Sequence, residues 1–203
     1  MPTISARASQ DFTGMIRSQL RVAVLAAIAL SAPAASGHAQ TPENVAVVIN
    51  DASPVSQRVG EYYIRQRNIP ASNVIHIRTS GEDAIGREAY VATIELPIGA
   101  ALYRERLLDR VLYIVLTKGV PLRIEGTGGM SGTVASVDSE LTLLYRKLLG
   151  QSPPTPGRVD NPYFLGPTRE LREAKRFSHK DLDIYLVSRL DAFTADRSEE
   201  PHV

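Results

Sequence analysis

Val45-Ala46-Val47-Val48-Ile49, followed by Asn50-Asp51, is the stretch that decides the fold of this 203-residue chain. A continuous apolar run rich in β-branched residues predicts a strand of a parallel sheet that is covered on both faces. Ser53-Pro54 comes next and supplies a helix cap and a first helical residue. Apolar residues at helical spacing then predict a helix over 54–67, and residues 74–77 predict a second strand. Strand, helix and strand together predict a right-handed βαβ unit.

The pattern of strand and helix continues outward from this unit. Residues 111–116 form the most apolar strand pattern of the chain and predict the third strand, and residues 184–188 predict the fourth. Residues 87–96 and 98–109 have helical patterns on either side of Pro97, which is expected to interrupt or kink the helix.

A further helix and three loops complete the predicted elements. The helix covers 138–149, with Ser136 or Asp138 as its cap and Gly150 at its end. Residues 78–86, 126–133 and 151–162 are predicted loops. The whole pattern predicts an α/β fold with three layers and a doubly wound, mainly parallel sheet of about four strands. The predicted order of these strands in the sheet is 2-1-3-4.

The first 39 residues have the organisation of a cleavable signal peptide. Arg17 and Arg21 precede an apolar run over residues 22–30, and Gly37-His38-Ala39 supplies small residues for cleavage. The run is shorter than the roughly 20 residues that span a bilayer. We therefore predict export to the periplasm or cell exterior, with a single α/β domain over 40–196 and a disordered tail over 197–203. An anchored helix and a start at Met15 are the alternatives.

Charge and cysteine content exclude several classes of function. Removal of residues 1–39 takes three arginines and one aspartate from 23 basic and 22 acidic residues, which leaves a net charge of −1. This balance does not favour nucleic acid or an anionic membrane surface as a partner, and we predict no membrane span after signal removal. The chain has no cysteine, which excludes disulfides, a cysteine nucleophile and a lipid anchor on cysteine.

Polar residues gather where the predicted strands end. Because parallel strands present their carboxyl ends at one edge of the sheet, these residues are expected to share that edge. The candidate ligand-binding residues are Asn50, Asp51, Lys118, Asp138, Glu140, Arg189 and Asp191. They match no known catalytic spacing, so no catalytic residue is assigned.

The acidic members of this group have two interpretations. Asp138 and Glu140 begin a helix, where carboxylates satisfy free N–H groups and complement the helix dipole. Alternatively, one of them acts with Asp51 or Asp191 as an oxygen ligand of Mg²⁺ or Ca²⁺, or as a general base. Asp51, Asp138 and Asp191 are therefore the candidate metal ligands. No motif for an organic cofactor is present, and a divalent cation is the cofactor that the sequence leaves open.

The basic members also have two interpretations. Lys118 and Arg189 either form internal ion pairs, which we favour, or hold an anionic ligand such as a carboxylate or phosphate. The predicted partner of Lys118 is Asp138 or Glu140. The planar guanidinium of Arg189 is suited to a carboxylate partner such as Asp191 or Asp138.

Other motifs are weak. The glycines of residues 126–132 do not stand directly between a strand and a helix, and the Gly-Lys-Ser/Thr ending of a phosphate-binding loop is absent. A lid is a better interpretation of that segment. His76, His179 and His202 have no metal-binding spacing, and no Gly-x-Ser-x-Gly elbow indicates a serine triad.

Several blocks resemble a family of exported bacterial proteins that share a conserved domain of unknown function. The resemblance covers about residues 44–194 and implies export and an α/β fold, but no activity. The blocks that carry it are Val45 to Asp51, Val59-Gly60 to Ile69-Pro70, Thr117-Lys118-Gly119-Val120-Pro121-Leu122, Ala135-Ser136-Val137-Asp138-Ser139-Glu140-Leu141, Asn161-Pro162-Tyr163 and Tyr185-Leu186-Val187-Ser188-Arg189-Leu190-Asp191.

A fainter similarity is to the first subdomain of the gingipain-like cysteine peptidases, which have a caspase-like fold. It is carried by residues 111–121, 136–138 and 186–189. In those peptidases the catalytic His and Cys lie further along the chain, so no catalytic residue is transferred. Members of the exported family also continue past the Arg-Leu-Asp block, and a truncated product is therefore an alternative that the sequence leaves open.

Two functions are consistent with these observations. The first is an exported α/β domain without catalysis of its own, which binds a ligand or partner at the carboxyl edge of the sheet. The alternative is a hydrolase, either metal-assisted or using a carboxylate acid/base pair, with Lys118 and Arg189 positioning an anionic substrate. The alternative requires that at least three of the four carboxylates Asp51, Asp138, Glu140 and Asp191 approach one point.

Overall fold

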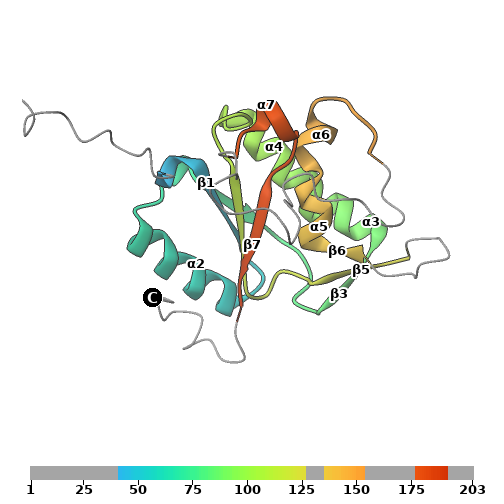
Figure 1. Cartoon of the computed structure of the whole chain (residues 1–203). Coiled ribbons are helices and arrows are strands. Elements are labelled where there is room, and N and C mark those ends of the chain that lie inside the picture. The colour runs from blue at the N-terminus through green and yellow to red at the C-terminus, as the bar shows by residue number, and fades with distance from the viewer. Residues whose placement is uncertain (1–40, 127–134, 154–176, 192–203) are drawn as a thin grey trace, which may run out of the picture. The chain divides into compact units, whose positions relative to one another are not determined.

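The computed structural model describes residues 41–126, 135–153 and 177–191 (Figure 1). The predicted signal peptide, the disordered tail, and most of the predicted loops over 126–133 and 151–162 lie outside these residues, as does the Asn161-Pro162-Tyr163 block. Among the described residues no helix has the length and apolar character needed to cross a membrane.

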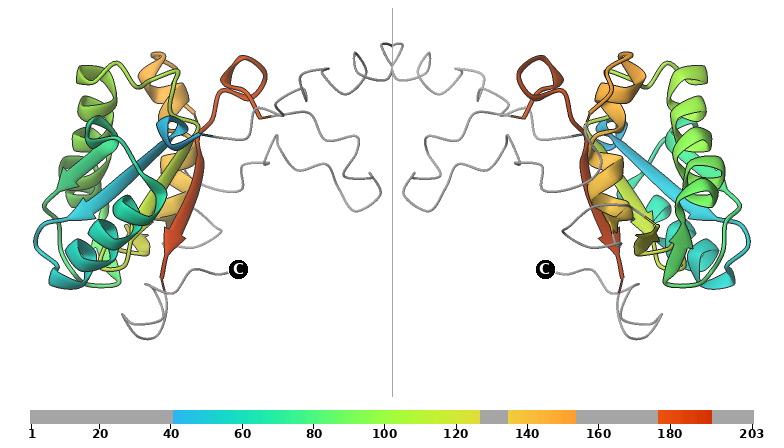
Figure 2. Two further views of the ribbon diagram at one scale, coloured as in Figure 1. Left: turned by 90° about the vertical axis from the view of Figure 1, so that its left-hand side faces the viewer. Right: turned by 90° about the vertical axis from the view of Figure 1, so that its right-hand side faces the viewer.

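The described residues form a parallel four-stranded sheet in the order β2-β1-β4-β7. Its strands are β1 (Val45–Asn50), β2 (Val74–Ile77), β4 (Tyr113–Thr117) and β7 (Leu186–Leu190). These are the four predicted strands in their predicted order. Figure 2 shows β7, in red, at one edge of the sheet. Strands β4 and β7 each begin two residues later than predicted. Strand β7 also continues to Leu190, two residues beyond its predicted end, so Arg189 lies inside it, opposite Leu116 of β4.

The first βαβ unit confirms the local capping argument. Helix α2 spans Pro54–Arg67, and the Ser53 side chain accepts a hydrogen bond from the Ser56 N–H at 3.3 Å. The helix ends at Asn68, whose φ of 52° is left-handed. A single 3-10 turn, η2 (Ala71–Asn73), leads into β2, and a similar turn, η1 (Pro42–Asn44), precedes β1.

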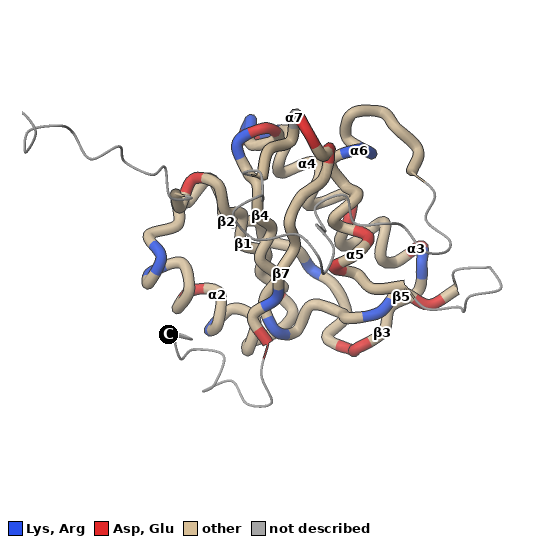
Figure 3. The backbone as a smooth tube through the Cα atoms, in the orientation of Figure 1, with Lys and Arg blue, Asp and Glu red and all other residues tan. Residues whose placement is uncertain are grey.

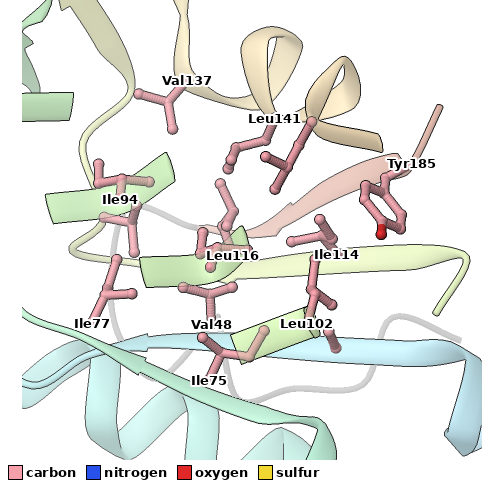
Figure 4. Packing of buried hydrophobic residues seen from close by; sticks show 14 of the residues in the cluster. Val48, Ile75, Ile77, Ile94, Leu102, Ile114, Leu116, Val137, Leu141 and Tyr185 are labelled. Atoms are coloured by element: carbon pink, nitrogen blue, oxygen red, sulfur yellow. The ribbon is translucent and has the colours of Figure 1, made fainter. Parts of the chain in front are cut away.

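Helices cover both faces of the sheet, so the fold has three layers (Figure 1). Val47, Ile49 and Val115 point to the α2 face, where they form a small core with Ile69. The opposite face carries the main core, in which Val48, Ile75, Ile114 and Leu116 contact side chains from the second helical layer, as Figure 4 shows. The alternation of buried side chains between two apolar faces explains the continuous hydrophobic runs of β1 and β4.

The second helical layer begins with a continuous helical segment that contains a π turn. Helix α3 (Arg87–Tyr90), the π-helical segment η3 (Val91–Glu95) and helix α4 (Leu96–Arg104) follow one another directly. The wider π turn precedes Pro97, which has no N–H and whose ring would crowd the Thr93 carbonyl in an α-helix. The interruption predicted at Pro97 is therefore a change from α-helix to π-helix just before the proline, and not a break in the helical segment. The helix ends at Arg104, not at 109, because Arg106 has a φ of 56°.

The predicted helix over 138–149 is divided into two. Helix α5 spans Val137–Thr142 and α6 spans Leu144–Leu148, and both belong to the second helical layer. The Thr142 carbonyl accepts a hydrogen bond from the Tyr185 N–H at 3.1 Å. That oxygen therefore bonds to the segment that leads into β7. The sequence pattern of the helix gives no indication of this tertiary contact. The predicted Ser136 cap and the Gly150 end, with φ of 80°, are confirmed.

A second, three-stranded sheet was not predicted. Strands β3 (Ala84–Gly86), β5 (Arg123–Glu125) and β6 (Ala135–Ser136) pair in the order β3-β5-β6. The prediction of a loop over 78–86 is wrong at its end, where Ile85 is buried and pairs with the buried Ile124. Strands of two or three residues are too short to produce a periodic pattern.

An aromatic cluster lies beside the start of β7. Helix α7 (His179–Leu182) was also not predicted. Its first residue, His179, stacks its ring on that of Tyr145, with ring centroids 4.1 Å apart. The buried His179 Nε2 donates to the Val111 carbonyl oxygen at 2.6 Å. Tyr185 packs edge-on against both rings, and its hydroxyl donates to the Leu108 carbonyl oxygen at 3.0 Å.

Candidate functional site

The carboxyl ends of β1 and β4 define the switch point of the sheet. From β1 the chain passes to β2 on one side, and it later returns to β4 on the other side of β1. In open α/β sheets, ligands bind where the strand order reverses in this way, outside the carboxyl ends of the strands. The loops that leave β1 and β4 are therefore the first place to look for a site.

Asn50, at the end of β1, is fully buried and joins three loops. Its Nδ2 donates to the carbonyl oxygens of Gly119 at 2.8 Å and Thr79 at 3.2 Å. Its Oδ1 accepts from the N–H groups of Ala52 and Thr79, both at 3.1 Å. Both ends of the amide are satisfied by the protein, so Asn50 positions the site and does not offer these atoms to a ligand.

The switch point itself is closely packed. The hydroxyls of Ser56 and Thr117 hydrogen-bond at 2.5 Å, and Thr117 also donates to the Val48 carbonyl oxygen. Gly119 has a φ of 94°, and a methyl group there would lie 2.3 Å from Ser53 Oγ. Glycine is needed for both the left-handed turn and the close approach of the two loops. The polar side chains of Ser56 and Thr117 at the switch point are therefore hydrogen-bonded within the protein.

Asp51 and His76 form a pair across the tips of β1 and β2. Asp51 Oδ1 lies 2.7 Å from His76 Nδ1, and the His76 side chain is 56% exposed. Asp51 is also partly exposed. A carboxylate at Nδ1 fixes the orientation of the ring and leaves Nε2 as its second polar atom.

Lys118 and Asp191 form the corresponding pair across the tips of β4 and β7. Lys118 Nζ donates to Asp191 Oδ1 at 3.1 Å, and both side chains are partly exposed. Figure 3 shows charges of both signs side by side at the lower end of β7. Lys118 therefore forms an ion pair, as we favoured, but it pairs with Asp191, whereas we predicted Asp138 or Glu140 as its partner.

Arg189 lies largely inside the protein and holds the loop after β4. Its guanidinium donates to both Asp138 oxygens, at 2.5 and 3.3 Å, and to the carbonyl oxygens of Val120 and Pro121 at 2.6 and 3.0 Å. Its side chain is only 9% exposed. The planar fork satisfies a carboxylate and two carbonyls together, which a lysine ammonium could not do with the same geometry. The preferred interpretation as an ion pair holds here too.

Glu140 belongs to a different cluster. Its buried carboxylate accepts a hydrogen bond from Arg87 at 2.9 Å, and its second oxygen lies 3.6 Å from Lys147 Nζ. Lys147 also donates to Glu95 at 2.5 Å, so four charges alternate through the interface of α3, η3, α5 and α6. The hydrogen bond to Glu140 raises the pKa of Arg87. Burial, together with the Glu95 and Glu140 carboxylates, raises the pKa of Tyr90.

The three candidate metal ligands are divided among separate partners. Asp51 pairs with a histidine, Asp138 with an arginine and Asp191 with a lysine. Within the part of the chain that the structure describes, no group of three or more His, Cys, Asp or Glu side chains gathers closely enough to hold a metal ion. The structure joins two pairs of the predicted residues, Lys118–Asp191 and Arg189–Asp138. Among the described residues the carboxylates do not meet at one point, so the convergence that the predicted hydrolase requires is not observed.

The sequence did not indicate a role for His76 or for the three residues that surround Glu140, namely Arg87, Glu95 and Lys147. The alternation in β2 contained a signal for His76, because Ile75 and Ile77 occupy the core face and leave the histidine on the other face, next to the end of β1. No local signal marks the pairs Arg87–Glu140 and Glu95–Lys147, because the partners in each are more than 50 residues apart in the chain.

Comparisons of the chain with protein-family models, with curated proteins and with solved structures found no match.

Proposed function

We propose that this protein is an exported α/β domain that binds a macromolecular partner through the carboxyl edge of its sheet and has no catalysis of its own. The observation that carries the proposal is the contrast between two layers of this edge. The deep layer is internally bonded: Asn50, Ser56 and Thr117 are buried, and the Arg189 side chain is 9% exposed. The outer layer presents the pairs Asp51–His76 and Lys118–Asp191, one on each half of the sheet.

A rigid base with a shallow charged surface is suited to a partner surface of mixed charge. Exposed ion pairs contribute little to folding stability, about 0–1 kcal/mol each. These side chains can therefore exchange partners at modest cost, and complementary charges improve the rate and specificity of association. The predicted signal peptide supports export. The net charge of −1 after removal of residues 1–39 argues against a nucleic acid partner.

The test is a comparison of three immobilised full-length proteins exposed to a cell-envelope extract. They are the wild type, the tip variant Asp51→Ala/Lys118→Ala, and the surface control Glu61→Ala/Arg65→Ala, which removes an exposed pair on α2. We expect a component retained by the wild type and the control but lost from the tip variant. Equal retention by all three proteins would contradict the proposal.

The Asp51–His76 pair favours hydrolysis as the second candidate function. A carboxylate 2.7 Å from Nδ1 orients imidazole as a general base that can activate water. Assays with chromogenic ester, phosphate and peptide substrates test this directly. Turnover that is lost in His76→Gln and Asp51→Asn but kept in Glu61→Gln would establish the hydrolase and reject the non-catalytic proposal.

A further inference from the structure

Helix α4 is apolar on all sides but exposed on one of them. Its residues, Leu96–Arg104, include a single charged side chain, Arg104, at the end. One face is buried in the main core through Ile98, Ala101 and Leu102, and Gly99 packs near Leu148. The opposite face is open, with Leu96 62% and Tyr103 78% exposed. A helix that is hydrophobic all round is normally covered on all sides.

The open face continues toward the start of the helical segment as a regular stripe. Glu88, Ala92, Leu96, Ala100 and Arg104, each four residues from the next, are all exposed. We call these five residues the α4 stripe. Tyr103 lies beside its carboxyl end. The stripe contains an acidic end, a small residue, a large apolar centre, a second small residue and a basic end.

We propose that the α4 stripe is the interface of a symmetric dimer, in which α4 packs antiparallel against α4 of a second copy. The order of the five residues is self-complementary under a twofold axis at Leu96. Each Glu88 then faces Arg104 of the second copy, and each Ala92 faces Ala100. The two Leu96 side chains meet at the centre. An isologous interface requires one patch to complement itself in this way.

Size and charge both support a second copy as the occupant. The small alanines on either side of Leu96 let two helices approach closely around a central leucine pair. The acidic and basic ends make the antiparallel arrangement attractive and a parallel one repulsive, because the latter would place like charges together. Arg104 makes a local surface pair with Glu105, whose side chains are both exposed and can be shared across the interface.

The dimer is expected to be weak. The stripe is about 24 Å long at 1.5 Å per residue, and an interface of one helix per copy lies at the small end of specific interfaces. We expect a dissociation constant of about micromolar or weaker. The dimer would present two copies of the strand-tip surface, so that a multivalent partner would be bound with avidity. The inference does not depend on the proposed function, because it rests on a different face.

The test is sedimentation equilibrium of the full chain from low to high micromolar concentration. The wild type is expected to show a monomer–dimer equilibrium. Leu96→Glu is expected to raise the dissociation constant by about tenfold or more, because it places two carboxylates at the centre of the interface. Leu122→Glu, which changes another exposed leucine, is the matched control and should leave the equilibrium unchanged.

Charge reversal tests the antiparallel arrangement independently of apolar packing. Glu88→Arg and Arg104→Glu should each weaken the dimer, and the double variant should restore it, because the reversed charges face each other again. Circular dichroism melts of each variant show whether it is folded. A wild type that stays monomeric over the whole range overturns the proposal and leaves the stripe to a different partner. A dimer that none of these stripe variants weakens also overturns it.

Discussion

Arg189 shows how a single side chain near the strand tips stabilises a loop. It is 9% exposed and donates to one carboxylate and two carbonyls. Arg189→Lys keeps the charge but loses the planar fork, so we expect a loss of about 2 kcal/mol in the free energy of unfolding. Urea denaturation measures this loss.

The same substitution at an exposed site supplies the control. Arg65 pairs with Glu61 at 3.9 Å, one helical turn away, and both side chains are about two-thirds exposed. Arg65→Lys should change the free energy of unfolding by less than about 0.5 kcal/mol. Equal effects at the two positions would show that the Arg189 contacts are not important for stability.

At the scale of elements, Gly60 in α2 and Gly99 in α4 differ in how closely the neighbouring element packs against the helix. A methyl group at Gly60 of α2 would lie 2.6 Å from the Ile49 side chain in β1, whereas one at Gly99 of α4 would lie 3.1 Å from the end of Leu148. Ile49 is buried and β-branched, so it cannot move aside easily. Gly60→Ala should therefore destabilise the fold by about 2 kcal/mol, despite the higher helix propensity of alanine.

Gly99→Ala is the comparison at the same scale. Because Leu148 is flexible at its end and only partly buried, the gain in helix propensity should prevail. We expect a change between zero and about 1 kcal/mol of stabilisation. Thermal denaturation of both variants checks the pair, and destabilisation by Gly99→Ala of the same size would show that the α4–α6 contact is as tight as that of α2 with the sheet.

The whole molecule is expected to lose stability in alkali through its buried tyrosines. Burial, and then the hydrogen bond to Asp109, raise the pKa of Tyr145 from 10.0 to about 12, and burial raises the pKa of Tyr185 and Tyr90 as well. A group whose pKa is raised by folding stabilises fully below its unfolded pKa. This contribution is lost as pH rises from about 10 through the folded value.

Melting temperature measured between about pH 9 and pH 12 checks this prediction. Tyr145→Phe should reduce the alkaline slope, because one fewer proton is released on unfolding. Tyr103→Phe, at an exposed tyrosine, should leave the slope unchanged. A wild-type melting temperature that stays constant across this range would contradict the argument.

The elements that could be predicted from the sequence are those that depend on interactions between residues close together in the chain. The βαβ unit was predicted with its cap at Ser53 because strand, cap and helix are specified within a few residues of one another. The ion pair of Arg189 with Asp138 was also predicted, because it follows from strand positions. Lys118 was predicted to form an ion pair, but its partner Asp191 was not the one expected. Strands β3, β5 and β6 were not predicted, because each forms by pairing with a strand elsewhere in the chain. The division of the helix at Leu143 was not predicted either, because the Thr142 carbonyl bonds to the distant Tyr185 N–H.

The sequence by itself determined the α/β class, the four parallel strands with their order, and the group of polar residues at the strand tips. Hydrophobic periodicity and local capping carry that information along the chain. Only the tertiary structure decided how those residues pair. It placed Asp51 beside His76, gave Arg189 to Asp138, and moved Glu140 into a cluster with Arg87 and Lys147. The reason is that a charge is neutralised by whichever opposite charge packing brings within about 4 Å, and packing depends on the whole fold.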